Sequence, residues 1–319
     1  MTNQVDELLL KAADKRTELF AASDTNCFRL ANGAGDGLDG FAVDLFGDWL
    51  LLHVYERGVL ESGELKSDYM DAVYKLADFI PVDVKGILLK NKIKPYTGAE
   101  RQSLLLAGSV PPKDFFVLQN GTRAFVDLIE GQNTGLFLDM REVRTALSEF
   151  YKQGEITSLL NLFCYTGFFS VHAIMNGVSR AVNVDLSGSV LKRAKKNYEL
   201  NGIYADDRNF IRRDAAEQIK ILSKQKAKFS LVIIDPPTFA RGKKKSFSVR
   251  DNYSGMLKSL SSIAEGGYVF SSLNTVSLSR EDYFKLHPRE WENVLYINEA
   301  CDFTSVGNPY LKTGLWKIP

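Results

Sequence analysis

The second half of the chain repeats one unit, a short apolar strand followed by a helical stretch. From Ile156 onward the strands read SLLNLF, RAVNVD, NFIRRD, SLVIID and GYVFSS. Strands that alternate with helices favour a parallel sheet with helices on both faces. The chain end, VLYINEACDF followed by LKTGLWKIP, predicts a strand pair that returns antiparallel without another helix. We therefore expect an α/β domain with a mostly parallel, seven-stranded sheet.

The first part of the chain has a different pattern. In CFRLANGAGDGLDGFAVDLFGDWLLLHVYE, apolar and polar residues alternate on either side of glycines, which predicts a small antiparallel sheet. SDYMDAVYKLADFI predicts a helix, and Asn120-Gly121 predicts a hairpin with a type I′ turn. We expect two domains: residues 1–130, an N-terminal helix with a small α+β module, and residues 131–319.

Gly35, Gly37 and Gly40 match the dinucleotide fingerprint G-x-G-x-x-G. That motif binds a pyrophosphate only where a strand precedes it and a helix opens after it. Here the strand-like FAVDLF follows, so we interpret the motif as a glycine-rich turn.

Composition limits the kind of partner. Forty basic and 39 acidic residues give a net charge of +1, so binding to nucleic acid or lipid must depend on local patches. No apolar run approaches the ~18 residues of a membrane span, and the acidic amphipathic start is unlike a secretory signal. The three cysteines have no metal-like spacing. We expect a cytoplasmic protein without membrane segments or a metal site.

Ligands of an open parallel sheet bind beyond the carboxyl ends of its strands. There the first strand is followed by Thr166 and Gly167, the second by Asp185, and the third by Asp214 and Ala215. Asp185 suits the hydroxyls of a ribose, as in NAD or S-adenosylmethionine, whereas one glycine makes a poor pyrophosphate loop. Both acids also fit an alternative role as helix caps.

The fourth strand ends in Asp235-Pro236-Pro237. Proline has a fixed φ and no donor, so it ends the strand and holds the neighbouring carbonyls in place. A carboxylate beside fixed carbonyls accepts hydrogen bonds from the edge of a nucleobase, and Phe239 would stack on its ring. Lys243, Lys244 and Lys245 would then bind RNA phosphates beside the base.

Together, NLFCYTGFFSVHA, NVDLSGSVLKRAKKNYELNG, RRDAAEQ and IIDPPTFARGKKKSF resemble successive motifs of class I S-adenosylmethionine-dependent methyltransferases. More narrowly, they are similar to the bacterial large-subunit (23S) ribosomal RNA methyltransferases that make 5-methylcytosine or 7-methylguanine. This resemblance implies a Rossmann-like catalytic domain, S-adenosylmethionine as the cofactor and ribosomal RNA as the partner. Many relatives open with a PUA-type RNA-binding domain, for which we expect no room before Phe28.

The resemblance also implies the site residues. VDLIEGQNTGLFLDMREVRTAL is similar to the family's link into the catalytic domain, and an arginine there would pair with the cofactor carboxylate. The implied cofactor site consists of Thr134, Phe137, Leu138, Asp139, Arg141, Asn161, Phe163, Tyr165, Thr166, Gly167, Asp185, Leu186, Ser187, Asp214, Ala215 and Asp235. The implied catalytic residues are Asp235, Pro236, Pro237, Phe239 and Asn274.

The choice of base depends on one loop. Methylation of cytosine C5 requires a cysteine thiolate, which the family's cytosine enzymes carry in a Ser-Cys-Ser stretch after the fifth strand. Here that stretch reads FSSLNT, and we interpret Cys164 as a packing residue. DPPTFARGKKKSFSV and FSSLN resemble the guanine-N7 members, so we expect guanine N7, with cytosine C5 or a noncatalytic RNA-binding relative as alternatives. Among the acceptor atoms of RNA, the exocyclic amine of guanine ranks third. The modified position and the oligomeric state stay open.

Overall fold

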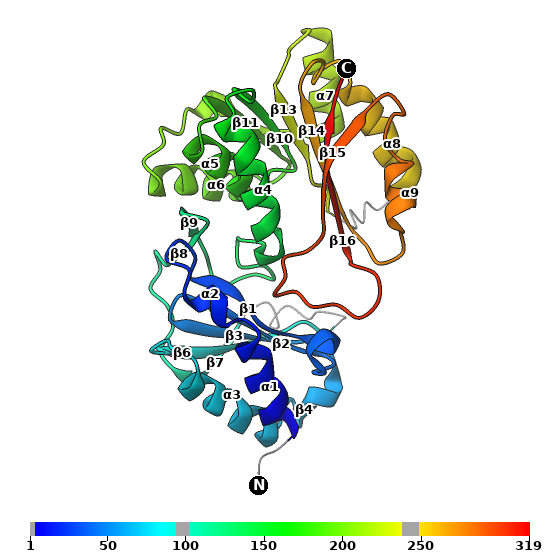
Figure 1. The fold of residues 1–319 in the computed structure, drawn as a ribbon. Helices are drawn as coiled ribbons and strands as arrows, with labels where there is room; N and C mark the ends of the chain where they lie inside the picture. Colours follow the sequence, from blue (N-terminus) through cyan, green and yellow to red (C-terminus); the bar gives the residue numbers. More distant parts are fainter. Residues whose placement is uncertain (1–3, 94–101, 238–248) are drawn as a thin grey trace. The chain divides into compact units, whose positions relative to one another are not determined.

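The computed structural model describes residues 4–93, 102–237 and 249–319, and Figure 1 shows their fold. The chain divides into two compact units. Unit 1 is Met1–Arg141 with Ala300–Gly307, and unit 2 is Glu142–Glu299 with Asn308–Pro319. The boundary expected from the sequence falls after residue 130, whereas the compact units divide after Arg141. Residues 300–307, near the end of the chain, belong to unit 1.

Unit 1 contains a five-stranded sheet in the order β1-β2-β3-β6-β7. As the alternation predicted, its first three strands are antiparallel; β3 then pairs with β6 in parallel and β6 with β7 antiparallel. Helices α1 and α3 pack on each other, and their apolar residues join the buried core of this sheet. The strands are β1 (Cys27–Asn32), β2 (Phe41–Phe46), β3 (Trp49–Val54), β6 (Gly86–Asn91) and β7 (Leu104–Gly108), and the helices are α1 (Gln4–Asp14) and α3 (Ser67–Phe79).

Shorter elements complete unit 1. One is the predicted hairpin, which turns at Asn120 and Gly121 with φ of 51° and 70°, as a type I′ turn requires. The short elements are α2 (Thr17–Phe20), β4 (Leu60–Glu61), β5 (Glu64–Leu65), β8 (Phe116–Gln119), β9 (Thr122–Phe125) and the 3₁₀ helices η1 (Gly33–Asp36), η2 (Arg57–Val59) and η4 (Leu138–Met140).

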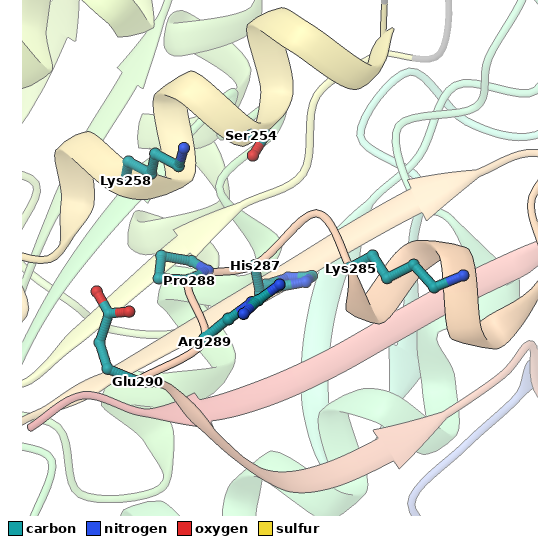
Figure 2. Close-up of a pocket in the computed structure, with 7 residues that line it drawn as sticks. All are labelled: Ser254, Lys258, Lys285, His287, Pro288, Arg289 and Glu290. Carbon is teal, nitrogen blue, oxygen red and sulfur yellow. The ribbon is translucent and has the colours of Figure 1, made fainter.

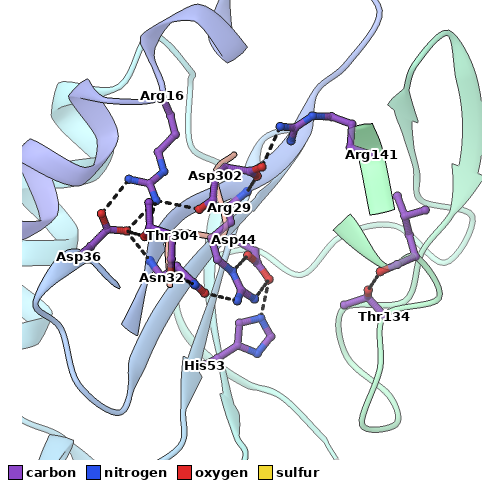
Figure 3. A network of polar contacts seen from close by, with 11 residues as sticks. Arg16, Arg29, Asn32, Asp36, Asp44, His53, Thr134, Arg141, Asp302 and Thr304 are labelled. Carbon is purple, nitrogen blue, oxygen red and sulfur yellow. Dashed lines mark hydrogen bonds and ion pairs between the residues drawn. The ribbon is translucent and has the colours of Figure 1, made fainter. Parts of the chain in front are cut away.

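The glycine-rich turn packs against segment 300–307. A β-carbon on Gly35 would lie 2.1 Å from the carbonyl oxygen of Thr304, so only glycine allows this approach. Arg16 donates to both carboxylate oxygens of Asp36, at 3.1 and 2.6 Å, and to the carbonyl of Asp302 at 2.7 Å (Figure 3). Since strand β2 follows the turn instead of a helix, the turn interpretation is confirmed.

The same contacts correct one expectation. VLYINEACDF was predicted as one strand, but β15 ends at Ile297. The carboxylate of Asp302 accepts from the backbone amide of Arg29 at 2.7 Å and from Arg141 Nη2 at 2.7 Å, both in unit 1. Polar contacts of this segment therefore outweigh its local strand propensity.

Unit 2 contains the expected seven-stranded sheet, in the order β12-β11-β10-β13-β14-β16-β15. The strands from β12 to β14 are parallel, and β16 pairs antiparallel with both β14 and β15. These strands are β10 (Ser158–Leu162), β11 (Arg180–Asp185), β12 (Phe210–Arg212), β13 (Leu231–Ile234), β14 (Tyr268–Asn274), β15 (Glu292–Ile297) and β16 (Leu311–Lys317).

Helices cover both faces of this sheet (Figure 1). Apolar side chains of α7, α8 and α9 join Leu160, Val232 and Val269 in one core cluster, so these helices cover one face. Helices α4, α5 and α6 cover the other face. The helical elements are α4 (Arg141–Lys152), α5 (Phe168–Met175), α6 (Gly188–Leu200), η5 (Asp207–Asn209), α7 (Ala215–Lys224), α8 (Val249–Leu260) and α9 (Arg280–Phe284). No helix in the described part of the chain is long and apolar enough to cross a bilayer.

Candidate active site

The candidate site lies at the carboxyl ends of the parallel strands of unit 2. Strand β10 pairs with β11 on one side and with β13 on the other, so strand order reverses there. Such a switch point is where open α/β sheets bind ligands. Within these strands, Leu160, Leu162, Val232 and Ile234 point to the α7–α9 face. By alternation, Asn161, Asn183, Asp185 and Asp235 belong to the opposite face.

The loop after β10 has an unusual backbone. Phe163 and Tyr165 have φ of 57° and 51°, and Gly167, which precedes α5, has φ of 69°. A left-handed backbone at residues other than glycine is uncommon and costs energy, so the surrounding contacts must hold it. The amide of Cys164 donates to Val184 O at 3.0 Å, and that of Gly167 to Cys164 O at 2.8 Å. This loop is therefore a rigid, compact turn.

Three buried asparagines also hold this loop and its helices: Asn161, which was expected in the cofactor site, and Asn183 and Asn197, which were not predicted. Asn197 Nδ2 donates to the carbonyl of Thr166 at 2.9 Å. Asn161 Nδ2 donates to Ser170 Oγ at 2.9 Å, and Asn183 Nδ2 to Tyr198 Oη at 2.8 Å. A signal was present, because asparagine inside an apolar strand such as SLLNLF or RAVNVD needs a buried partner.

Asp185 joins two loops. Its Oδ2 accepts from the backbone amide of Tyr165 at 3.1 Å, and its Oδ1 accepts from that of Ser187 at 2.9 Å. The N-cap of α6 is Ser187, whose Oγ accepts from Val190 N at 3.4 Å, so Asp185 is not the helix cap. Asp185 is half-buried, Leu186 beside it is exposed, and each carboxylate oxygen has further acceptor capacity.

Asp214 has the capping role that its sequence also suggested. It is the N-cap of α7, and its Oδ1 accepts from the amide of Glu217 at 3.1 Å. Asp214 is exposed, whereas Ala215 is buried. One carboxylate oxygen is thus used by the cap, and Oδ2 is the atom left to contact a ligand.

Asp235 follows β13 and receives a hydrogen bond from Ser272 Oγ on β14. This role of Ser272 was not predicted from the sequence. Tyr253 of α8 donates to the carbonyl of Ser272 at 3.1 Å, which ties the end of β14 to that helix. Pro236 is half-buried, Pro237 is exposed, and Asn274 is the exposed last residue of β14. Phe239 and Lys243–Lys245 lie outside the described residues.

The neighbouring Ser271 belongs to a buried network on the opposite face. Its Oγ contacts His287 Nε2 at 2.8 Å and accepts from Trp316 Nε1 at 3.0 Å. His287 Nδ1 lies 3.0 Å from the carbonyl of Tyr283, so Nδ1 carries the proton and Nε2 accepts from Ser271. Burial lowers the pKa of His287 to about 3. Ser271 therefore supports packing, whereas Ser272 faces the candidate site.

Cys164 is buried in the loop after β10. Burial, together with the charge of Asp185, raises the pKa of its thiol well above the ordinary value. A nucleophilic cysteine needs a lowered pKa and an accessible sulfur. The packing interpretation of Cys164 agrees with these surroundings.

The expected residues from the linking segment belong to unit 1. Thr134 is buried and its Oγ1 donates to Leu136 O at 3.2 Å, and the carbonyl of Asp139 accepts from Ala300 N at 2.9 Å. Phe137 is exposed and Leu138 is buried. Arg141, expected to pair with a cofactor carboxylate, forms an ion pair with Asp302 at 2.7 Å (Figure 3). The other expected cofactor residues are in unit 2.

The described donor set fits a nucleoside cofactor. Asp185 offers carboxylate oxygens for ribose hydroxyls, and the tight loop from Phe163 to Gly167 brings backbone close to the same strand end. A β-carbon at Gly167 would lie 3.0 Å from that of Ala194, so this approach of loop to helix requires glycine. The sequence model of the S-adenosylmethionine-dependent methyltransferase family matches residues 75–305, which include this whole sheet edge.

The chain belongs to this methyltransferase family. S-adenosylmethionine is therefore its cofactor. The methyltransferase is 32% identical to the Bacillus subtilis protein YwbD, named as a ribosomal RNA large subunit methyltransferase, over 86% of this chain and 67% of that protein. It is 30% identical to ribosomal RNA large subunit methyltransferase I of Aeromonas salmonicida, over 73% of this chain and 56% of that one.

Solved structures agree with this assignment. A SAM-dependent methyltransferase from Streptococcus mutans superposes with a TM-score of 0.83 at 26% identity, over 98% of this chain and 81% of that chain. A methyltransferase structure complexed with SAH gives a TM-score of 0.84 at 26% identity, with the same coverage. The Rossmann-like fold, the preceding small unit and the S-adenosylmethionine cofactor are thereby confirmed.

Proposed function

We propose that this methyltransferase acts on a base of large-subunit ribosomal RNA and that the acceptor atom is guanine N7. The substrate class is supported by the names of the two relatives from Bacillus subtilis and Aeromonas salmonicida. We also propose that unit 1 faces the RNA.

One observation carries the choice of guanine N7, namely the lack of an activated thiol in unit 2. Carbon 5 of cytosine becomes nucleophilic only after a thiolate adds to carbon 6. The β14 stretch offers Ser271 and Ser272, and the one cysteine of unit 2, Cys164, is buried with a raised pKa. Guanine N7 has an in-plane lone pair, so it requires no covalent intermediate and no prior loss of a proton.

S-adenosylmethionine, when bound, supplies an electrophilic methyl group on a sulfonium. The chain's residues position it: Asp185 accepts from the ribose hydroxyls, Asp214 from the adenine amine, and the Phe163–Gly167 loop contacts the methionine portion. Asp235 and the carbonyls around Pro236 and Pro237 accept from the N–H groups of the guanine edge. Catalysis is then positioning with preorganised electrostatics.

Charge balance gives Asp235 a second role. As the bond from N7 to the methyl carbon forms and the bond to sulfur breaks, positive charge moves to the guanine ring and no proton is released. The carboxylate of Asp235, oriented by Ser272, favours that charge. Stacking on the base by Phe239, phosphate contacts by Lys243, Lys244 and Lys245, and a contact of Asn274 with the base complete the proposal.

The substrate class is tested by transfer of a labelled methyl group from S-adenosylmethionine to unmodified large-subunit and small-subunit ribosomal RNA, assayed separately. The proposal expects label in the large-subunit RNA only. Label in the small-subunit RNA alone would contradict it. Tight cofactor binding with no label in either RNA would favour a noncatalytic RNA-binding relative.

A further inference from the structure

A basic pocket lies on unit 2, apart from the candidate active site. Its cavity of about 420 Å³ is lined by residues of α8 and of the segment between α9 and β15 (Figure 2). These residues are Ser254, Lys258, Lys285, His287, Pro288, Arg289 and Glu290. Three are cationic and one is acidic, although the whole chain carries a net charge of only +1.

Two of the cations have no partner within the described part of the chain. Among the residues that the structure describes, the side chains of Lys258 and Arg289 make no hydrogen bond, ion pair or ring contact, and both residues are exposed. Lys285 makes an exposed pair with Asp282 at 3.1 Å. The side-chain donors of Lys258 and Arg289 therefore remain available for an anion.

The floor of the pocket is rigid. The ring of His287 stacks on Trp316, with centroids 3.8 Å apart and an angle of 17° between the planes. Both ring nitrogens of His287 have partners, Ser271 and Tyr283. Ser254 Oγ donates to the carbonyl of Leu286 at 2.8 Å, which joins α8 to the other wall. A fixed floor with exposed cationic side chains at its rim favours binding of a phosphate group.

The pocket and Asp235 lie on opposite faces of the sheet. His287, in the pocket floor, contacts Ser271 Oγ at 2.8 Å, whereas Ser272, the next residue of β14, contacts Asp235 on the other face. The pocket therefore cannot hold the target base, and an RNA chain that reaches the active site has to extend past β14 to the other face to enter the pocket.

We infer that this pocket binds a backbone phosphate of the RNA substrate, at a nucleotide other than the methylated one. The inference depends on the proposed RNA substrate and adds a second contact site on unit 2. An ordinary alternative is that Lys258 and Lys285 only stabilise the ends of α8 and α9, where cations favour the helix dipole. That alternative predicts a loss of stability and no change in RNA affinity.

The test is a salt titration of binding to unmodified large-subunit ribosomal RNA. For Lys258→Gln/Arg289→Gln we expect affinity at 0.1 M salt to fall about tenfold and the log–log salt slope to shrink by about 0.7 to 0.9, as for one lost phosphate contact. Glu290→Gln removes the acid and should tighten binding. Affinity for S-adenosylmethionine and the melting temperature should stay unchanged in both.

Lys220→Gln/Lys224→Gln is the matched control, because both lysines are exposed on α7, outside the pocket. Equal affinity and salt slope for the pocket and control variants, with wild-type protein binding RNA, would overturn the pocket alone. Failure of wild-type protein to bind the RNA would overturn both the pocket and the proposed substrate.

Discussion

Three carboxylates of the site have defined hydrogen-bond donors within the protein. Asp185 accepts from two backbone amides, Asp214 accepts from one, and Asp235 accepts from the Ser272 hydroxyl. These bonds fix the oxygen positions, so less rotational entropy is lost when a ligand arrives.

Replacement of Asp185 tests the ribose role. We expect Asp185→Ala to weaken S-adenosylmethionine binding about 10- to 100-fold, because hydrogen bonds to a charged group contribute about 1.5 to 3 kcal/mol. Asp207→Ala removes an exposed acid of η5 that pairs with Lys195 and should leave affinity unchanged. Calorimetric titration measures the affinity of both variants for S-adenosylmethionine. Equal affinities of Asp185→Ala and Asp207→Ala would contradict the ribose role of Asp185.

Replacement of Cys164 tests the direct attack by N7. We expect Cys164→Ala to retain turnover within about twofold, since a buried thiol with a raised pKa supplies no thiolate. Turnover is measured on large-subunit ribosomal RNA, with the melting temperature as the folding control. Loss of activity in a variant that melts like wild type would assign the thiol a chemical role.

At the scale of elements, β14 separates two tasks between its faces. Ser271 faces α9 and the buried His287, whereas the adjacent Ser272 contacts Asp235 on the other face. Since successive strand residues point to opposite sides, one strand supports both the core and the site.

This division predicts opposite consequences for two serine substitutions. Ser271→Ala leaves the buried Trp316 Nε1 and His287 Nε2 without a partner, so the free energy of unfolding should fall by about 1 to 3 kcal/mol or more. Ser272→Ala should lower kcat severalfold with a smaller loss of stability. Urea unfolding measures the stability of both variants, and steady-state kinetics measures their kcat. A larger loss of stability in Ser272→Ala and a larger loss of kcat in Ser271→Ala would contradict this division.

The repeated strand–helix pattern was sufficient to predict the elements of unit 2, and the Asn120-Gly121 dipeptide the hairpin of unit 1. The strand VLYINEACDF was mispredicted because Asp302 and Thr304 are fixed by Arg16, Arg29 and Asp36, which lie far away in sequence. Contacts across the sheet such as Ser272 with Asp235 were missed for the same reason. Strand register is not visible in a single sequence.

At the scale of the whole molecule, all three histidines are buried. Burial lowers the pKa of each: that of His172 falls to about 4, helped by the charge of Arg144, that of His287 to about 3, and that of His53 below its ordinary value. Each unit therefore contains at least one imidazole that folding keeps neutral.

Acidification should destabilise the protein from pH 6.5 downward. A histidine with a lowered pKa in the folded state binds its proton first in the unfolded state, so stability is full above pH 6.5 and is lost toward the folded pKa. At pH 5.5 the two histidines of unit 2 should together cost about 3 kcal/mol relative to pH 8. Denaturant unfolding at these two pH values measures the change in the free energy of unfolding. Equal stability at both would contradict the lowered pKa values of the two histidines.

The most direct measurement is the identity of the methylated nucleoside. Large-subunit ribosomal RNA lacking modifications would be incubated with S-adenosylmethionine and the protein, digested to nucleosides, and analysed by mass spectrometry. The account predicts 7-methylguanosine, formed by direct attack without a thiol. A 5-methylcytidine product would contradict it and would require a cysteine nucleophile, with Cys164 and Cys301 as the residues to replace first.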